Sequence, residues 1–252
     1  MRYIVWSIQN QGALPLPSMD ALSYELAPYL ERAGSRVANS LPSPRTLSVH
    51  TTHRLTPFHP KSRYIYVARD VRDACVSYYH FCRDSLGGKA YQDATFDEFF
   101  EEFVEGAVPY GDFFEHVRDW WVQRTQANVL FTTYEAMHAD PRKVVLQVAR
   151  FISDDEHDYE STLLADGELL LRKVLQNTSF GQMKSSIPVV IKRATQDSCG
   201  DSLLDAGVKV DFFRKGIVGD WINYLSEEQV RRLEQRGIEK EAGTGFLQLW
   251  TE

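Results

Sequence analysis

The sequence predicts an α/β fold with a mainly parallel central sheet and helices on both of its faces. Residues 64–68 and 128–133 are short apolar runs rich in β-branched and aromatic residues, which is typical of buried strands. A helical pattern follows each run, over residues 70–83 and 140–151, and strands that alternate with helices form parallel sheets. No internal repeat or linker is visible, so we expect one domain over residues 1–252.

The other elements are predicted in chain order from helical spacing, caps and turn residues. They are helices over residues 3–9, 19–34, 95–105, 112–124, 161–175, 178–184 and 226–237, a strand over residues 45–51, and a long loop over residues 187–209. The first helix has neither a cap nor a strand before it, although an α/β domain normally opens with a strand.

The stretch from Arg63 to Arg83 organises the prediction. Asp70 is expected to cap the helix, with Asp73 as the acid at its third position. Arg69 then lies where the strand ends, and Ser77 lies about 120° from the centre of the apolar stripe of the helix. An arginine at the carboxyl end of a strand, beside a helix N-terminus, is where α/β sheets hold anions. The alternative is an ordinary solvated arginine and a surface serine.

Composition limits the class of protein. The chain has 252 residues, of which 43% are hydrophobic and 12% aromatic, so it can bury a sizeable core. No segment approaches the roughly 18 apolar residues of a membrane span, and no signal peptide is evident. A net charge of -7 argues against a general nucleic-acid binder but allows a small anionic ligand held by local basic groups. The three cysteines, Cys75, Cys82 and Cys199, lack metal-ligand spacing and indicate reduced thiols.

Four blocks of sequence resemble the cytosolic sulfotransferases, which move a sulfuryl group from 3′-phosphoadenosine 5′-phosphosulfate (PAPS) to a hydroxyl or amine. They are YVARDVRDACVSYYHF at 66–81, VPYGDFFEHVRDWW at 108–121, TSFGQMK at 178–184 and FFRKGIVGDW at 212–221. The segments 43–53 and the stretch around Tyr134 are weaker matches. The resemblance covers the chain from about residue 41 to its end, and four blocks in the family's order are hard to obtain by chance.

The resemblance implies a set of residues that bind the 3′-phosphate of PAPS. In the family these are the strand-end arginine and the serine eight residues later, here Arg69 and Ser77, and an Arg-Lys-Gly loop, here Arg214, Lys215 and Gly216. A planar guanidinium contacts phosphate oxygens in pairs, and a glycine lets backbone amides approach. Taken alone, Arg214 and Lys215 would indicate no more than a solvated basic loop.

The resemblance also implies an adenine site and an acceptor site. Family members place a tyrosine, a threonine and a phenylalanine around the adenine, here Tyr134, Thr178 and Phe180, although core packing is the alternative for Phe180. Phe58 and Tyr110, together with the 187–209 loop, are predicted to line the acceptor pocket.

His53 corresponds to the family's catalytic base, the histidine of a Lys-Thr-His motif. A histidine with an ordinary pKa of about 6.5 can accept a proton near neutral pH. The resemblance implies that it takes the proton of the acceptor hydroxyl, whose oxygen attacks sulfur in line. A lone histidine is more often structural, and only its place in the family's order distinguishes His53 from the other six.

The sequence departs from the family in three places. Thr51 stands where the family has a lysine. The opening strand and its phosphosulfate-binding loop, of the Pro-Lys-Ser-Gly-Thr-Thr-Trp type, do not appear before the first helix. Each lost hydrogen-bond donor to the transition state costs roughly 3–4 kcal/mol. We therefore expect a chain without this loop, whether incomplete or degenerate, to lose much of its catalytic rate. Residues 222–230 keep almost none of the family's Lys-x-x-x-Thr-Val-x-x-x-Glu dimer motif, so we expect a monomer or weak homodimer.

We therefore expect a cytoplasmic sulfotransferase that uses PAPS and no metal and acts on a small hydroxylated acceptor. The main alternative is a protein that keeps the nucleotide half of the site and does not catalyse. A nucleotide kinase of related fold is a second alternative, which the lack of a Gly-x-x-x-x-Gly-Lys-Ser/Thr sequence disfavours.

Overall fold

The computed structural model describes residues 1–13, 18, 21–84, 89–187, 190–191, 208–209 and 213–250. Its α-helices are α1 (Arg2–Gln9), α3 (Leu30–Ser40), α4 (Val71–Asp84), α5 (Lys89–Gln92), α6 (Phe96–Glu105), α7 (Phe113–Trp121), α8 (Tyr134–Ala139), α9 (Pro141–Ile152), α10 (Tyr159–Leu164), α11 (Leu169–Asn177), α12 (Phe180–Ser186) and α13 (Glu227–Glu241). The strands are β1 (Tyr64–Ala68), β2 (Val129–Thr133), β3 (Val190–Ile191) and β4 (Val208–Lys209). Shorter π or 3₁₀ turns are η1 (Leu22–Leu26), η2 (His53–Leu55), η3 (Asp166–Glu168), η4 (Asp220–Asn223) and η5 (Phe246–Trp250).

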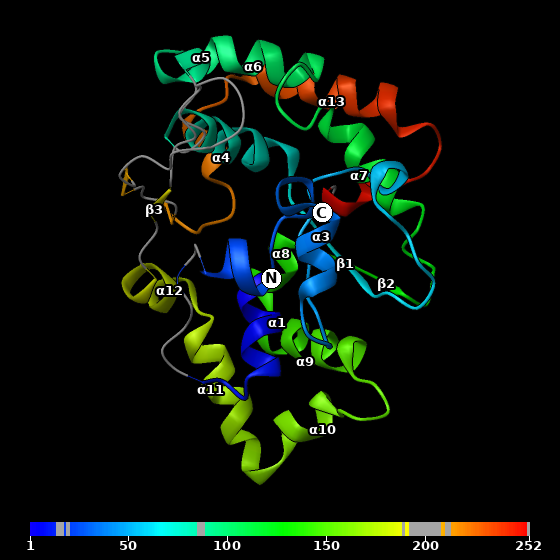
Figure 1. The fold of residues 1–252 in the computed structure, drawn as a ribbon. Coiled ribbons are helices and arrows are strands. Elements are labelled where there is room, and N and C mark those ends of the chain that lie inside the picture. The colour runs from blue at the N-terminus through cyan, green and yellow to red at the C-terminus, as the bar shows by residue number, and fades with distance from the viewer. Residues whose placement is uncertain are drawn as a thin grey trace.

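The central sheet is a parallel pair. β1 pairs with β2 from Tyr64 opposite Val129 to Ala68 opposite Thr133, so both strands end at the same edge. The predicted parallel pairing of these two strands is confirmed, and helices lie on either side of the pair (Figure 1). β3 and β4 form a separate antiparallel ladder of two residues each.

Each face of the β1–β2 pair packs on its own hydrophobic cluster. Tyr66, Ala68 and Phe131 face a cluster that draws on α4, α6, α7 and α13. Ile65 and Leu130 face a second cluster, built from α1, α9, α10 and α11. Successive strand residues point to opposite faces, so this division of neighbours between two clusters confirms that helices cover both faces.

Local capping chemistry explains where several helices begin. Thr95 and Glu98 form a reciprocal capping box at the start of α6, and Ser226 and Gln229 form another at α13. Asp140 caps α9, whose first residue is a proline. Gly106 ends α6 in the left-handed conformation that glycine adopts without strain. These signals made the helices over residues 95–105, 140–151 and 226–237 predictable from the sequence.

Two predicted elements in the N-terminal part are wrong. The 45–51 strand does not form; one parallel bridge joins Ser48 to Tyr29. The predicted helix over residues 19–34 is interrupted, because η1 ends before Pro28 and α3 begins only at Leu30. Proline has no backbone N–H to continue a helix. Gly34, predicted as a stop, lies inside α3 as a kink with φ 72° and ψ 174°.

Three further boundaries differ from the prediction. The helix predicted over residues 161–175 is two helices, α10 and α11, because the chain turns through positive φ from Asp166 to Glu168. The helix predicted to end at Gly237 continues to Glu241, and Gly237 packs closely against Leu247 and Phe114. Of the predicted 187–209 loop, the β3–β4 ladder replaces four residues and most of the rest lies outside the described residues.

Cys75 and Cys82 are free thiols that are fully buried in the α4-side cluster, whereas Cys199 lies outside the described residues. Burial raises the pKa of the Cys82 thiol to about 12, so it stays protonated at neutral pH.

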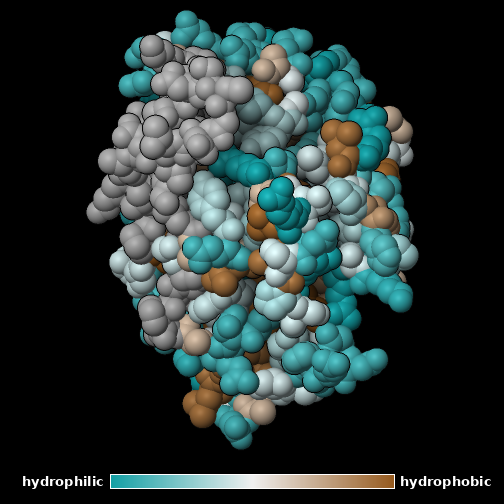
Figure 2. Space-filling view, viewed as in Figure 1, coloured by the Kyte–Doolittle hydropathy of each residue, from teal (hydrophilic) through white to brown (hydrophobic). Residues whose placement is uncertain are grey.

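None of the helices in the described part of the chain is both long and apolar enough to cross a membrane. The face shown in Figure 2 is largely hydrophilic, with small separate hydrophobic patches.

Candidate active site

The carboxyl end of β1 leads directly into α4, and a set of hydrogen bonds holds this junction. Asp70 caps the helix, since its Oδ1 accepts from the backbone N–H of Arg72 at 2.8 Å. The N–H of Asp70 itself donates to Glu135, which follows β2, at 3.0 Å. Asp73 occupies the third helical position as predicted, but its buried carboxylate accepts from the N–H groups of Gly219 and Trp221, at 2.6 and 3.0 Å.

Arg69 connects the ends of both strands to the 213–224 segment. Its guanidinium carbon lies 4.3 Å from the ring centroid of Tyr134, and it donates to the carbonyl of Ile217 at 3.2 Å. Its Nη2 lies 3.8 Å from the Asp73 carboxylate. The side chain is 20% exposed, and its Nε is buried without a partner among the described residues. These contacts rule out the solvated-arginine interpretation.

The segment from residue 213 to 224 runs along one face of α4, which Figure 1 shows in orange beside that helix. Arg214 and Lys215 both contact Asp220, at 2.5 and 2.8 Å. The Asp220 side chain is fully buried. Burial alone would raise its pKa, but hydrogen bonds from Lys215, Arg214 and Asn223 outweigh this and lower the pKa to about 2. Two cations therefore share one carboxylate and keep a net positive charge.

The predicted adenine residues lie around the same segment. Tyr134 opens α8 and stacks on Arg69, and burial raises the pKa of its phenol. Gly216 has φ +67°, and an added Cβ there would come within 2.3 Å of the Phe180 ring, so only glycine allows this approach. Phe180 is half-buried, and none of the hydrophobic clusters of the described residues includes it, which disfavours core packing as its role.

α12 is tied to the cation-bearing loop. Lys184 donates to the carbonyl of Arg214 at 2.9 Å, and the rings of Phe180 and Phe213 are 6.0 Å apart. Thr178 lies at the end of α11, where its hydroxyl donates to the carbonyl of Val174 at 2.8 Å. Phe212 lies outside the described residues.

His53 lies in η2, on a loop that is fastened to α7. Its ring contacts the rings of Phe58 and Trp120 edge to face, with centroids 4.8 and 5.3 Å apart. The indole N–H of Trp120 donates to the carbonyl of Thr51 at 3.2 Å, and the hydroxyls of Thr51 and Thr56 are 2.8 Å apart. His53 Nε2 is buried and has no hydrogen-bond partner among the described residues.

An aromatic wall lies beside His53, and two of its members come from β1, which the sequence predicts as a buried strand. The wall comprises Phe58, Tyr64, Tyr66 and Trp120, with ring centroids 4.6 to 5.9 Å apart. Tyr66 donates its hydroxyl to His116 Nδ1 at 2.9 Å, because His116 Nε2 donates to the carbonyl of His50 at 3.0 Å. Burial lowers the pKa of His116.

Tyr110 is the second residue that the sequence predicts to line the acceptor pocket. It adopts φ 70°, is 43% exposed, and stacks on His50 at 4.6 Å. His50 is itself stacked on Tyr29, at 4.5 Å, and its Nδ1 lies 2.6 Å from Glu31. The described part of the chain shows no hydrogen bond or ring contact between Tyr110 and His53 or Phe58.

β1 relates the two groups of residues to each other. Tyr66 belongs to the wall beside His53, and Arg69 begins the cation-bearing group three residues later, about 10 Å along an extended chain. The structure thus brings Arg69, Tyr134, Arg214, Lys215, Gly216 and Phe180 into one connected set, with Ser77 half-buried on the adjoining face of α4. His53 and Phe58 form the other set.

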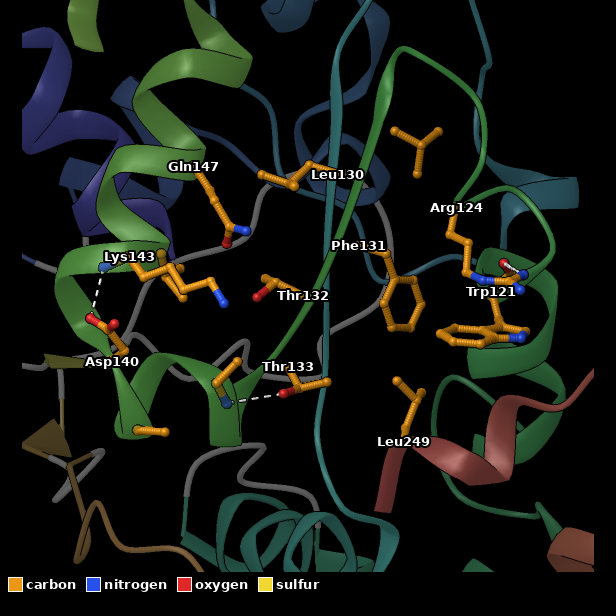
Figure 3. Close-up of a pocket in the computed structure, with 14 residues that line it drawn as sticks. Trp121, Arg124, Leu130, Phe131, Thr132, Thr133, Asp140, Lys143, Gln147 and Leu249 are labelled. Atoms are coloured by element: carbon orange, nitrogen blue, oxygen red, sulfur yellow. Dashed lines mark hydrogen bonds between the residues drawn. The ribbon is translucent and has the colours of Figure 1, made fainter. Parts of the chain in front are cut away.

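A cavity of about 570 Å³ lies elsewhere, along the edge of β2 that faces away from β1. Figure 3 shows Asp140, Lys143 and Gln147 on one side of this strand and Trp121, Arg124 and Leu249 on the other. Asp140 and Thr133 serve there as helix caps, accepting from Lys143 and Ala136. None of the predicted site residues lines this cavity, and it does not coincide with the candidate site.

Known proteins resemble this chain over almost all of its length. Residues 1–245 match the family model described as the sulfotransferase domain. Sulfotransferase 1C2 of Oryctolagus cuniculus is 34% identical over 90% of this chain and 73% of its own length. The chain belongs to the sulfotransferase family.

Other sulfotransferases and solved structures extend this result. Sulfotransferase 1E1 of Rattus norvegicus is 33% identical over 92% of this chain and 75% of its own. The crystal structure of mouse sulfotransferase SULT7A1 complexed with PAP matches with a TM-score of 0.63 and 29% identity, covering 82% of this chain and 69% of that one. Retinol dehydratase, at 20% identity and a TM-score of 0.69 over 97% and 77%, supports the fold alone. The predicted sulfotransferase fold and family are confirmed.

Proposed function

We propose that this sulfotransferase moves a sulfuryl group from PAPS to the hydroxyl of a small acceptor, such as a phenol, an alcohol or a steroid. Membership of the family supports the reaction, and the PAP-bound mouse relative supports the donor. Two features beside β1 together carry the proposal. His53 Nε2 is buried in an aromatic wall with no partner among the described residues, and a connected cluster of cations lies at the carboxyl end of the same strand.

His53 is the proposed general base. Its Nε2 takes the proton of the acceptor hydroxyl, while the acceptor oxygen forms a bond to sulfur. The bond between sulfur and the 5′-phosphate oxygen breaks, and that oxygen keeps the electron pair as adenosine 3′,5′-bisphosphate (PAP) leaves. The edge-to-face contacts with Phe58 and Trp120 hold the ring in place and limit its access to water.

The cation-bearing set is the proposed nucleotide site. Arg69, Ser77, Arg214 and Lys215 would bind the 3′-phosphate, with the backbone N–H of Gly216 beside them. Arginine is suited to this because its planar fork matches two phosphate oxygens. Tyr134, Thr178 and Phe180 would enclose the adenine; the close approach of Phe180 to Gly216 supports this placement.

Phe58 and Tyr110 are the proposed acceptor contacts. The stacked rings of Phe58 and Tyr64 offer an apolar surface next to His53, which suits an aromatic or steroidal acceptor. We further propose that the chain is a single domain, that it is cytoplasmic and a monomer or weak homodimer, and that its reaction needs no metal ion. Activity in excess chelator and sedimentation of the purified chain test the last two statements.

Two assays test the function. Transfer from sulfur-labelled PAPS to a panel of phenols, alcohols and steroids measures catalysis. Calorimetry with PAP measures the nucleotide site separately, on the native chain, on Arg69→Ala and on Arg150→Ala. Arg150 is a matched control, because it is an exposed arginine whose partner, Glu160, lies remote from the site.

We expect transfer by the native chain, and PAP binding that Arg69→Ala loses and Arg150→Ala keeps. PAP binding without transfer to any acceptor would overturn the catalytic proposal and favour the non-catalytic nucleotide-binding alternative. A folded chain that binds no PAP would overturn both, and transfer from ATP instead would favour the kinase alternative.

A further inference from the structure

His80 lies on α4, three residues after Ser77, and the two side chains are therefore about 60° apart on one helix face. The 213–224 segment covers this face. Asp73, one turn before Ser77, holds Gly219 and Trp221, and the ring of Tyr224 meets the ring of His80 edge to face at 5.4 Å. Arg214 Nη1 reaches the same Tyr224 at its hydroxyl, 3.5 Å away. His80 and Arg214 thus have a common neighbour.

The hydrogen bonds of His80 define its tautomer. Arg83 Nη2 lies 3.4 Å from His80 Nδ1, and an arginine can only donate, so Nδ1 is the acceptor. The proton of the neutral ring is then on Nε2. His80 Nε2 is buried and finds no acceptor in the described part of the chain. Buried polar groups are nearly always paired, so a buried N–H donor of this kind is suited to an acceptor brought by a ligand.

Four charged groups face the His80 ring. Arg83 and Asp84 come from α4 itself, and Arg214 and Asp220 come from the covering segment. Burial lowers the pKa of His80, and Arg214 and Arg83 lower it further, whereas Asp84 and Asp220 raise it. The net shift is downward, so the ring is neutral at neutral pH and presents Nε2–H as an uncharged donor.

We propose that His80 is a phosphate-binding residue, which donates from Nε2 to an oxygen of the nucleotide's 3′-phosphate beside Ser77 and Arg214. This inference rests on the proposed function. Asp220 already binds both Arg214 and Lys215. The N–H at His80 Nε2 has no carboxylate partner among the described residues, so it can donate to a phosphate oxygen without competition. A bound phosphate would place negative charge beside the ring, so PAP binding would be accompanied by proton uptake.

Calorimetry with two probes tests this role. PAP carries the 3′-phosphate, and adenosine 5′-monophosphate lacks it. His80→Phe keeps a ring but removes the donor, and His80→Gln places an amide N–H near the position of Nε2. We expect His80→Phe to weaken PAP binding roughly ten- to hundredfold, as for a lost hydrogen bond to a charged group, and to leave the monophosphate unchanged. His80→Gln should keep most of the PAP affinity.

A second readout is the number of protons taken up, from PAP titrations in buffers of different ionisation enthalpy. The phosphates of PAP, whose second pKa is about 6, also exchange protons on binding, so the readout is the difference between variants. We expect the native chain to take up a larger fraction of a proton than either His80 variant. A merely structural histidine would weaken the two nucleotides equally, and that result, or native PAP affinity in His80→Phe, would overturn the inference while leaving the proposed function intact. If the native chain binds no PAP, the proposed function fails and this inference fails with it.

The test survives poor folding of the phenylalanine variant, because His80→Asn serves in its place. Asparagine reaches only as far as Nδ1, so it should lose PAP affinity that His80→Gln keeps. Thermal unfolding of each variant verifies that it is folded at the assay temperature. Equal PAP affinity in the asparagine and glutamine variants would contradict a donor at Nε2.

Discussion

The surroundings of Arg69 and of His53 differ in kind, although both lie beside β1. Arg69 and the facing loop carry three cations that are partly neutralised by two carboxylates, since Asp73 faces Arg69 and Asp220 holds Arg214 and Lys215. His53 is instead held by the rings of Phe58 and Trp120, and its Nε2 has no partner among the described residues.

The difference indicates how each region would respond to substrate. In the Arg69 region an arriving phosphate competes with carboxylates for cations that are already placed, so affinity depends on the loop that carries them. In the His53 region no described residue competes for Nε2, so its function depends on proton affinity and on the position of the ring. Changes in the first region should alter binding, and changes in the second should alter turnover.

The largest effect should come from His53→Gln. Loss of a general base typically lowers the rate by about 10²- to 10⁴-fold, so we expect kcat to fall by that factor while PAP affinity stays unchanged. Sulfuryl transfer and PAP calorimetry on the same preparation measure the two quantities. His59→Gln, an exposed histidine on the same loop, is the matched control and should keep full activity. If the His53 variant loses PAP binding as well, the two regions are not functionally separate.

Asp73→Ala should have the next largest effect, and it acts in the Arg69 region. The change removes the acceptor of two loop N–H groups, at Gly219 and Trp221. Since each buried donor left unpaired costs about 1–3 kcal/mol, we expect a loss of roughly 2–4 kcal/mol in the free energy of unfolding and a weaker affinity for PAP. Urea unfolding measures the first quantity. Asp154→Ala removes an exposed carboxylate that also accepts from two backbone N–H groups, so it should cost less stability and leave PAP affinity unchanged; equal losses in both variants would refute the anchoring role.

Acid should destabilise the Arg69 region through Asp220. Its pKa in the folded chain is about 2, below the ordinary value of 3.8, so it favours folding above pH 4 and this contribution is lost as pH falls from 4 to 2. The contribution is no more than about 2.5 kcal/mol, since one pKa unit corresponds to about 1.4 kcal/mol. Unfolding in urea at pH 5 and pH 2.5, native against Asp220→Asn, isolates it from the other carboxylates. The asparagine variant should lose less stability between the two pH values; an identical loss would contradict the buried ion pair.

The Arg69 region was the more predictable from sequence, for a physical reason. The strand, the Asp70 cap and the helix after it are local features, and local patterns predict local structure. The role of Asp73 was not predictable, because its partners Gly219 and Trp221 are 146 and 148 residues away. The contacts of Asp220 with Arg214 and Lys215 were not predictable either, although these three residues lie within seven positions of each other.

The His53 region shows the limits of pattern reading. Trp120 lies in an aromatic helix that reads as core, and its role beside His53 depends on the Thr51 carbonyl, 69 residues before it. The predicted 45–51 strand before His53 does not form, because the described residues pair this segment with Tyr29 through a single bridge at Ser48 and through no longer ladder. The sequence does carry one usable signal, since Tyr64 and Tyr66 are aromatic at alternate positions of a strand and so share a face.

The smallest expected effect is that of Phe58→Ala, and it tests whether the aromatic wall binds the acceptor or only holds His53. Phe58 is half-buried and stacks on Tyr64 at 4.6 Å. If Phe58 contacts the acceptor, KM for an aromatic phenol should rise several-fold, as expected for an aromatic pair worth roughly 0.5–1.5 kcal/mol, with kcat nearly unchanged. If it only positions His53, kcat should fall instead and KM should stay constant. A short aliphatic alcohol is the control substrate, because it cannot stack, so a rise in KM confined to the phenol would assign Phe58 to acceptor binding.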